Sequence, residues 1–319
     1  MKAAVVTDFT RAPRYADFPE PTAARPAELV VDVLAAGLHP RVRSQADGSH
    51  YTSAGTLPMV PGVDGVGRDA TGALRYFVLD EPRLGAMAER TVIDARRSIV
   101  LPPHADPVAV AAAMNPVMSS WLALAHRARI EPGRSVLILG ATGSAGRMAV
   151  QVARRFGAAR IVVAGRDPER LAQVAARAEA AVSLRGADDE VAAAIAHEAA
   201  DVDVVLDYVW GPTTAAAMTA LITARPDRGA PLTWVEIGSV GGPSAAIPSA
   251  ALRAADLRLV GSGQGSVGTR EILAELPAMA EAITSGEFDA DAVPIPLADV
   301  ERAFADPALA EARVVIVPS

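Results

Sequence analysis

The hydrophobic pattern changes twice along the chain and divides it into three parts. The first part favours β-strands, as in residues 27–37, which begin by alternating apolar and polar residues as a half-buried strand does. The middle alternates short apolar runs with longer amphipathic segments, and the part from residue 288 returns to strand-like segments. We therefore expect a β-rich domain at 1–116 and 288–319, into which a second domain at 117–287 is inserted.

The middle part predicts a doubly wound parallel sheet. Parallel strands that helices cover on both faces are apolar throughout and show no alternation. Helices are expected between these strands, and one of them begins at Pro168 with Asp167 as its N-cap. The expected strands lie at residues 135–139, 160–165, 180–184, 203–207, 231–238 and 257–263.

Two other stretches carry local predictions. Residues 107–125 hold no charge, which by length alone allows a membrane helix. Because Asn115 and Pro116 interrupt the run, we expect two buried helices that meet at Asn115. Residues 38–67 are rich in Gly and Pro without helical periodicity and are expected to form loops and short strands.

Composition narrows the possible functions. The formal net charge of −7 argues against an extended nucleic-acid-binding face. The chain has no cysteine, which excludes disulfides and thiolate metal sites and favours a cytoplasmic location. The N-terminal segment has strand character and lacks the apolar region of a signal peptide.

A glycine-rich turn between the first expected strand and helix of the middle domain predicts a dinucleotide-binding site. Residues 141–146 follow the spacing G-x-G-x-x-G, with alanine at its first position. Gly143 allows close approach of a pyrophosphate, Gly146 allows close helix packing, and the helix N-terminus at Ser144 offers free N–H groups. The residues predicted to contact the cofactor here are Ala141, Thr142, Gly143, Ser144, Ala145 and Gly146.

The end of the second expected strand indicates which dinucleotide binds. NAD-dependent folds carry an acidic residue there for the ribose 2′-hydroxyl, whereas this chain has Gly165 and Arg166. A guanidinium binds a 2′-phosphate in bidentate fashion, Gly165 leaves room for it, and Arg170 lies one helical turn further on. The acid at Asp167 is instead expected to cap a helix. We therefore predict NADPH.

With these features together, the chain resembles the medium-chain dehydrogenase/reductase superfamily, specifically its zinc-independent quinone oxidoreductase branch. The resemblance covers essentially the whole chain. It implies an α/β protein with a GroES-like catalytic domain, a Rossmann domain and an active site in the cleft between them. It is carried by residues 35–67, 115–124, 136–158, 204–211 and 235–242.

The resemblance also indicates which residues would have to bind a catalytic zinc ion. Zinc-dependent relatives hold the catalytic metal with Cys, His and Cys, and a Glu follows the His. Here His39, Val63 and Asn115 stand at those three positions and Asp64 at the fourth. Valine offers no ligand atom, so no metal site is expected. The similar enzymes transfer hydride from NADPH to quinones or α,β-unsaturated carbonyls.

Several side chains become candidates through the resemblance. Tyr51 is expected to donate a hydrogen bond to the acceptor oxygen or to form an apolar wall of the pocket. His39 is expected to orient the ligands or to act as a structural histidine, and Asn115 lies in the segment that meets the nicotinamide. Gly238 and Ser239 pass beside the nicotinamide ribose. Two roles stay open for Asp207, lining the cofactor groove or capping the next helix.

The expected partners are a small-molecule substrate and, from the resemblance, a second copy of the chain in a homodimer. Nucleic acid and membrane partners are not expected. Two alternative functions stay open. One is an enoyl-thioester reductase of the same fold, although no convincing basic patch for a carrier is found. The other is a non-catalytic, regulatory protein that binds NADPH.

Overall fold

The computed structural model describes residues 1–49, 56–79, 83–263, 265–309 and 312–318. Contacts between Cα atoms divide the chain into two compact units. We call residues 1–115 with 273–319 the β-rich unit and residues 116–272 the parallel-sheet unit. The boundary at which the chain returns to the β-rich unit falls within α8 (Thr269–Thr284). The sequence places this boundary later, at residue 288.

The parallel-sheet unit holds a six-stranded sheet with strand order β10-β9-β8-β11-β12-β13. All five pairings are parallel, and the order reverses direction beside β8, as in a doubly wound fold. Every strand predicted for this part of the chain is confirmed. The strands are β8 (Ser135–Leu139), β9 (Arg160–Gly165), β10 (Ala180–Ser183), β11 (Val204–Asp207), β12 (Leu232–Glu236) and β13 (Leu257–Gly261).

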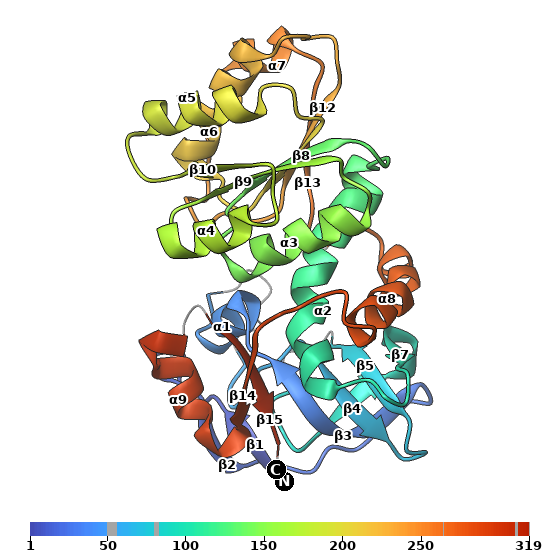
Figure 1. The fold of residues 1–319 in the computed structure, drawn as a ribbon. Coiled ribbons are helices and arrows are strands. Elements are labelled where there is room, and N and C mark those ends of the chain that lie inside the picture. The colour runs from blue at the N-terminus through green and yellow to red at the C-terminus, as the bar shows by residue number, and fades with distance from the viewer. Residues whose placement is uncertain (50–55, 80–82, 264, 310–311, 319) are drawn as a thin grey trace. The chain divides into compact units, whose positions relative to one another are not determined.

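Helices cover both faces of this sheet (Figure 1). α3 and α4 lie on one face, and α5, α6 and α7 lie on the other. The second face contains one continuous apolar core, which includes the fully buried Trp234. The helices are α3 (Ser144–Arg155), α4 (Pro168–Ala175), α5 (Asp188–Ala199), α6 (Gly211–Ala224) and α7 (Ser249–Ala254).

The β-rich unit is built on a seven-stranded sheet in which β15 pairs with β3. The C-terminal strands therefore join the sheet of the N-terminal strands, as the sequence predicted. The same unit contains two short helices, α1 (Pro40–Ala46) and α9 (Val300–Ala305). The strands are β1 (Lys2–Val5), β2 (Arg14–Asp17), β3 (Glu28–Gly37), β4 (Asp64–Asp69), β5 (Leu74–Val78), β6 (Arg90–Asp94), β7 (Ser98–Val100), β14 (Ala292–Pro296) and β15 (Arg313–Val317).

The prediction that residues 38–67 contain no helix is wrong at α1. Pro40 stands in its first turn, where a missing N–H costs no hydrogen bond. Val42 and Ala46, four residues apart, are buried on one face. Tertiary burial of that face stabilises a helix too short for its periodicity to be recognised in the sequence.

The predicted break at Pro116 is also wrong, because α2 (Pro107–Leu122) continues through it. Proline has no N–H, so the carbonyl of Ala112, four residues earlier, loses its helical donor. Arg313 of β15 replaces that donor. Its Nε donates to the Ala112 carbonyl, and its Nη2 lies 3.4 Å from the Ala111 carbonyl oxygen.

Arg313 makes these contacts in the interior of the β-rich unit, where only 4% of it is exposed. Burial lowers the pKa of the guanidinium to about 10, although the Asp64 carboxylate opposes the shift. A side chain at Gly37 cannot fit here, since its Cβ would lie 2.8 Å from the Ala111 carbonyl oxygen and 3.3 Å from Arg313 Nη2. The glycine, the arginine and the proline-containing helix therefore depend on one another.

α2 continues into a π-helical segment, Ala123–Ala128. Among the described residues, this combined helix, Pro107–Ala128, is the one whose length and composition would allow it to cross a membrane. Its most apolar stretch is 67% buried inside the protein, which is the pattern of a core helix.

Replacing Arg313 tests its role as a substitute donor. Arg313→Met leaves the Ala112 carbonyl unpaired in the core, so we expect a loss of about 2–4 kcal/mol in the free energy of unfolding. Pro116→Ala restores an N–H for that carbonyl. In the Pro116→Ala background, Arg313→Met should therefore cost about 1 kcal/mol less. Urea unfolding of the four proteins measures the difference, and an equal cost in both backgrounds would contradict this role.

Candidate functional site

The glycine-rich turn connects the carboxyl end of β8 to the first turn of α3. Gly140 has a φ of +87°, a left-handed conformation that glycine adopts readily. α3 begins at Ser144, as predicted, and its N-cap residue, Gly143, provides no side-chain hydrogen bond. The first N–H groups of a helix have no partners within it, so this N-terminus can bind an anion.

The glycines around the turn have different roles. A Cβ at Gly146 would lie 2.2 Å from the Gly140 carbonyl oxygen, so the predicted close packing of helix and turn requires glycine there. A Cβ at Gly143 would meet only that same oxygen, at 3.5 Å, which is ordinary contact. Protein packing therefore leaves the space beside Gly143 open, as a bound phosphate requires.

Gly165 leaves space for the Thr142 side chain, a role that the sequence did not predict. Its Cβ would lie 2.2 Å from Cγ2 of Thr142, so the glycine accommodates a side chain of the turn. The N–H groups of Gly140 and Ala141 also donate to the carbonyl of Ala164, each at 2.9 Å. The turn is thus held against the end of β9 by backbone hydrogen bonds and by the Thr142 methyl group.

Of the two residues after β9, Asp167 caps a helix, as predicted, and Arg166 places a cationic side chain at the surface. The Asp167 carboxylate accepts a hydrogen bond of 2.9 Å from the N–H of Arg170 and caps α4, with Pro168 in the first turn. Arg166 is exposed. Its guanidinium has no hydrogen bond or ion pair with the other residues that the structure describes. This edge of the sheet therefore presents a guanidinium that is unpaired among the described residues, while the carboxylate next to it in the chain is used in capping α4.

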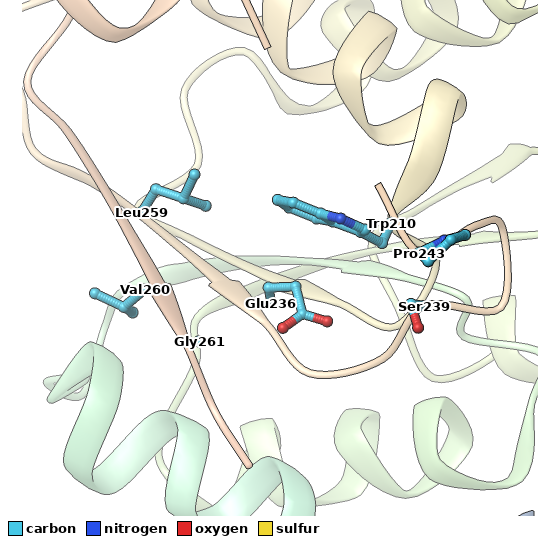
Figure 2. A pocket seen from close by; sticks show the side chains of 7 residues that line it. All are labelled: Trp210, Glu236, Ser239, Pro243, Leu259, Val260 and Gly261. Carbon is cyan, nitrogen blue, oxygen red and sulfur yellow. The ribbon is translucent and has the colours of Figure 1, made fainter. Parts of the chain in front are cut away.

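Gly238 and Ser239 follow β12 at the same edge of the sheet. The N–H groups of Ile237 and Gly238 both donate to the Asp207 carbonyl, at 2.8 and 3.2 Å. Ser239 borders a cavity of about 340 Å³. Figure 2 shows the indole of Trp210 and the carboxylate of Glu236 around this cavity. Burial, and the nearby charge of Asp207, raise the pKa of the Glu236 carboxyl group.

The side chain of Asp207 is fully buried and binds the protein itself. Its Oδ1 accepts hydrogen bonds from the N–H groups of Val209 and Trp210, at 2.8 and 2.9 Å. Its Oδ2 accepts from Thr214 Oγ1 and Trp234 Nε1, at 2.8 and 3.0 Å. Of the two roles left open for this residue, these contacts fit a structural one at the start of α6.

Tyr208, which follows Asp207, is a site residue that the sequence analysis missed. Its backbone lies against Gly238, and its Cβ would be 3.2 Å from a Cβ at Gly140. Its hydroxyl lies 3.2 Å from Ser119 Oγ, and burial raises the pKa of Tyr208 to about 12. The available signal was its position after a parallel strand, where ligands bind in such sheets.

In the β-rich unit, His39 and Asp64 form a buried pair. His39 Nε2 lies 3.1 Å from Asp64 Oδ1, and the Tyr76 hydroxyl donates to Asp64 Oδ2 at 2.8 Å. Burial lowers the pKa of His39, although Asp64 opposes the shift. Burial disfavours the Asp64 carboxylate, but His39, Tyr76 and Arg313 together keep the pKa of Asp64 below its usual range. The pair therefore combines a neutral imidazole with a carboxylate.

The remaining catalytic candidates are not brought together by the described structure. Tyr51 lies outside the described residues. Asn115 is half-buried in α2, and Val63 is a buried aliphatic side chain. Among the described residues, no group of three or more His, Asp or Glu side chains is placed to hold a metal ion.

Known proteins are similar to this chain over its whole length. A family model described as the saccharopine dehydrogenase NADP binding domain matches residues 136–226. A probable NADPH-dependent quinone reductase of Emericella nidulans is 29% identical, with 100% of both chains covered. The quinone oxidoreductase of Thermus thermophilus is 27% identical, with a TM-score of 0.80 over 99% of this chain and 100% of its own. These similarities support the predicted resemblance to the medium-chain dehydrogenase/reductase superfamily, in its quinone oxidoreductase-like branch.

The fold of this superfamily extends to more distant structures. A mycobacterial quinone oxidoreductase is only 20% identical, yet its structure gives a TM-score of 0.83 with 100% of both chains covered. The β-rich unit corresponds to the GroES-like domain of the superfamily and the parallel-sheet unit to its Rossmann domain, which confirms the predicted fold class.

The buried His39 predicts how stability depends on pH. Because the folded state lowers the pKa of His39 below its usual 6.5, the unfolded chain binds the proton more readily. The free energy of unfolding should therefore fall as pH decreases below about 6.5, by up to about 1.4 kcal/mol per pH unit. Thermal or urea unfolding at about pH 7.5 and about pH 5.5 measures this loss.

His39→Gln removes the titrating group, so the loss between the two pH values should become smaller. His197→Gln, at an exposed side chain, is the matched control. If His39→Gln leaves the pH dependence unchanged, the imidazole is not a source of it.

Proposed function

We propose that this chain is an NADPH-dependent oxidoreductase that transfers hydride, without zinc, to a quinone or an α,β-unsaturated carbonyl. The observation that carries the proposal is the end of β9 beside an open glycine turn, where Arg166 has no ion pair with a described residue and the acid that follows, Asp167, caps α4. The names of two relatives support it. The Emericella relative is a probable NADPH-dependent quinone reductase, and the Thermus quinone oxidoreductase has been solved with NADPH.

The residues of the parallel-sheet unit fit this cofactor. The open space at Gly143 and the first N–H groups of α3 suit a pyrophosphate. Arg166, with Arg170 one turn further on, suits the 2′-phosphate, and Gly238 and Ser239 would border the nicotinamide ribose. Bound NADPH supplies the hydride, and the protein has to hold it, orient the acceptor and exclude water.

The donor set around His39 supports zinc independence. Val63 has no ligand atom, and Nε2 of His39 is engaged by Asp64. Because the chain has no cysteine and Val63 replaces the histidine, the Cys, His and Cys ligands of the zinc-dependent relatives are not available at these positions. A conjugated acceptor suits such an enzyme, because conjugation already spreads the negative charge that develops on the oxygen. Tyr51 stays a predicted hydrogen-bond donor to that oxygen.

The proposal includes a homodimer in the cytoplasm. β13 is an edge strand of its sheet. Leu259 on β13, Leu252 on α7 and Val240 after β12 are exposed by 37%, 48% and 75%. Exposed apolar side chains beside an open strand edge support association between copies of the chain. Light scattering during size-exclusion chromatography measures the mass of the assembly.

A panel of acceptors tests the reaction. With NADPH, we expect turnover of quinones or conjugated enones and none of simple ketones, with no loss of rate on adding a chelator. NADPH oxidation followed by absorbance measures the rate. Turnover confined to enoyl-thioesters would favour the alternative reductase, binding without any turnover would favour the regulatory alternative, and inhibition by the chelator would contradict the metal-free reaction.

Arg166→Ala tests the cofactor assignment. Loss of a charge-assisted hydrogen bond to the 2′-phosphate should weaken NADPH binding about 10-fold to 100-fold and NADH binding by no more than about twofold. Isothermal titration calorimetry with each nucleotide measures both affinities. An equal effect on the two nucleotides would mean that Arg166 does not read the 2′-phosphate.

A further inference from the structure

Arg185 lies beside Arg166, although it is 19 residues further along the chain. β10 pairs with β9 so that Ser183 stands opposite Gly165, and the N–H of Leu184 donates to the Gly165 carbonyl at 2.9 Å. Nε of Arg185 then donates to the Arg166 carbonyl at 2.6 Å. The ends of two adjacent strands therefore bring two arginines to one place on the rim of the sheet.

Neither of these guanidinium groups has an ion pair with a carboxylate of the described residues. Other arginines of the parallel-sheet unit do. Arg160 pairs with Asp201 at 2.7 Å, and Arg134 pairs with Asp203 at 3.2 Å. The Arg185 guanidinium lies against the Arg166 backbone, and two cations at one rim without carboxylate partners attract an anion. In a chain with a net charge of −7, this pair is a local positive site.

Three acidic side chains beside this edge of the sheet, Asp167, Glu190 and Glu198, form no ion pair with these two arginines. The Asp167 carboxylate is used in capping α4. Glu190 and Glu198 line, together with Arg185, a cavity of about 360 Å³, but neither comes within ion-pair distance of the Arg185 guanidinium. The Arg185 side chain is exposed beside this cavity, so a ligand can reach it.

We propose that Arg185 is a second ligand of the 2′-phosphate of NADPH, acting together with Arg166. The inference rests on the proposed function. Because Nε is engaged by the Arg166 carbonyl, the donors of Nη1 and Nη2 stay available for phosphate oxygens. The same hydrogen bond holds the Arg166 backbone in position. Discrimination between NADPH and NADH is therefore divided between the ends of β9 and β10.

Nucleotide binding to Arg185→Ala tests this role. The probes are NADPH and 2′,5′-ADP, which carry the 2′-phosphate, and NADH and 5′-AMP, which lack it. We expect the first two to bind about 10-fold or more weakly and the last two to change by no more than about twofold. Calorimetry measures all four affinities without requiring catalysis, and far-UV circular dichroism verifies folding.

Two further variants sharpen the result. Arg258→Ala removes an exposed arginine from β13, at the opposite edge of the same sheet, and should leave all four affinities unchanged. Arg185→Lys keeps the charge and should recover part of the affinity for 2′,5′-ADP. If Arg185→Ala and Arg185→Lys both bind 2′,5′-ADP as tightly as the wild type, the phosphate-ligand role is overturned.

The outcomes separate this inference from the proposed function. If Arg185→Ala weakens all four probes equally, or none, the inference is wrong while a preference of the wild type for NADPH still supports the proposed cofactor. If the wild type itself binds NADH as tightly as NADPH, the proposed cofactor fails and the inference fails with it.

Discussion

The guanidinium of Arg313 replaces the helical donor that Pro116 lacks, and the interior of the β-rich unit is arranged around this contact. A buried carbonyl without a donor costs free energy, so α2 can continue through a proline only where another group supplies the hydrogen bond. A buried cation in turn needs an anion nearby, and Asp64 provides it. Asp64 also accepts hydrogen bonds from His39 and Tyr76, so the charge of Arg313 helps to keep His39 neutral.

In the parallel-sheet unit, too, a buried charged side chain has its hydrogen bonds supplied by the protein, but here the charge is negative. The Asp207 carboxylate lies where β11 ends, and its four hydrogen bonds hold the backbone before α6 and the indole of Trp234. With Asp207 satisfied internally, Tyr208 and the glycine turn can form the rim of the sheet. The backbone at this edge of the sheet is therefore held in place by a buried acid whose four hydrogen bonds all stay within the protein.

Arg166 and Arg185 are available to a ligand because the nearby polar groups bind elsewhere in the protein. The Asp167 carboxylate caps α4 and forms no ion pair with Arg166. Several other arginines of this unit are held by carboxylates or by more than one carbonyl group, as Arg225 is by the carbonyls of Ala200, Val202, Ala230 and Pro231. Arg166 has no ion pair with a described carboxylate, and Arg185 uses only its Nε, on the Arg166 carbonyl, so both keep donors for a ligand.

The sequence by itself determined the parallel strands, the cap at Asp167, the start of α3 at Ser144 and the return of the C-terminal strands to the first sheet. The first three depend on periodicity or on local hydrogen bonding between residues close in the chain, and the last follows because an all-parallel sheet has no place for the strand-like C-terminal segments. It could not foresee that α2 continues through Pro116, that Gly165 accommodates Thr142, or that Arg185 meets Arg166. Those features need partners distant in sequence or on neighbouring strands. Only the tertiary structure decided them, because a buried hydrogen bond or a close contact depends on which distant atoms folding brings within reach.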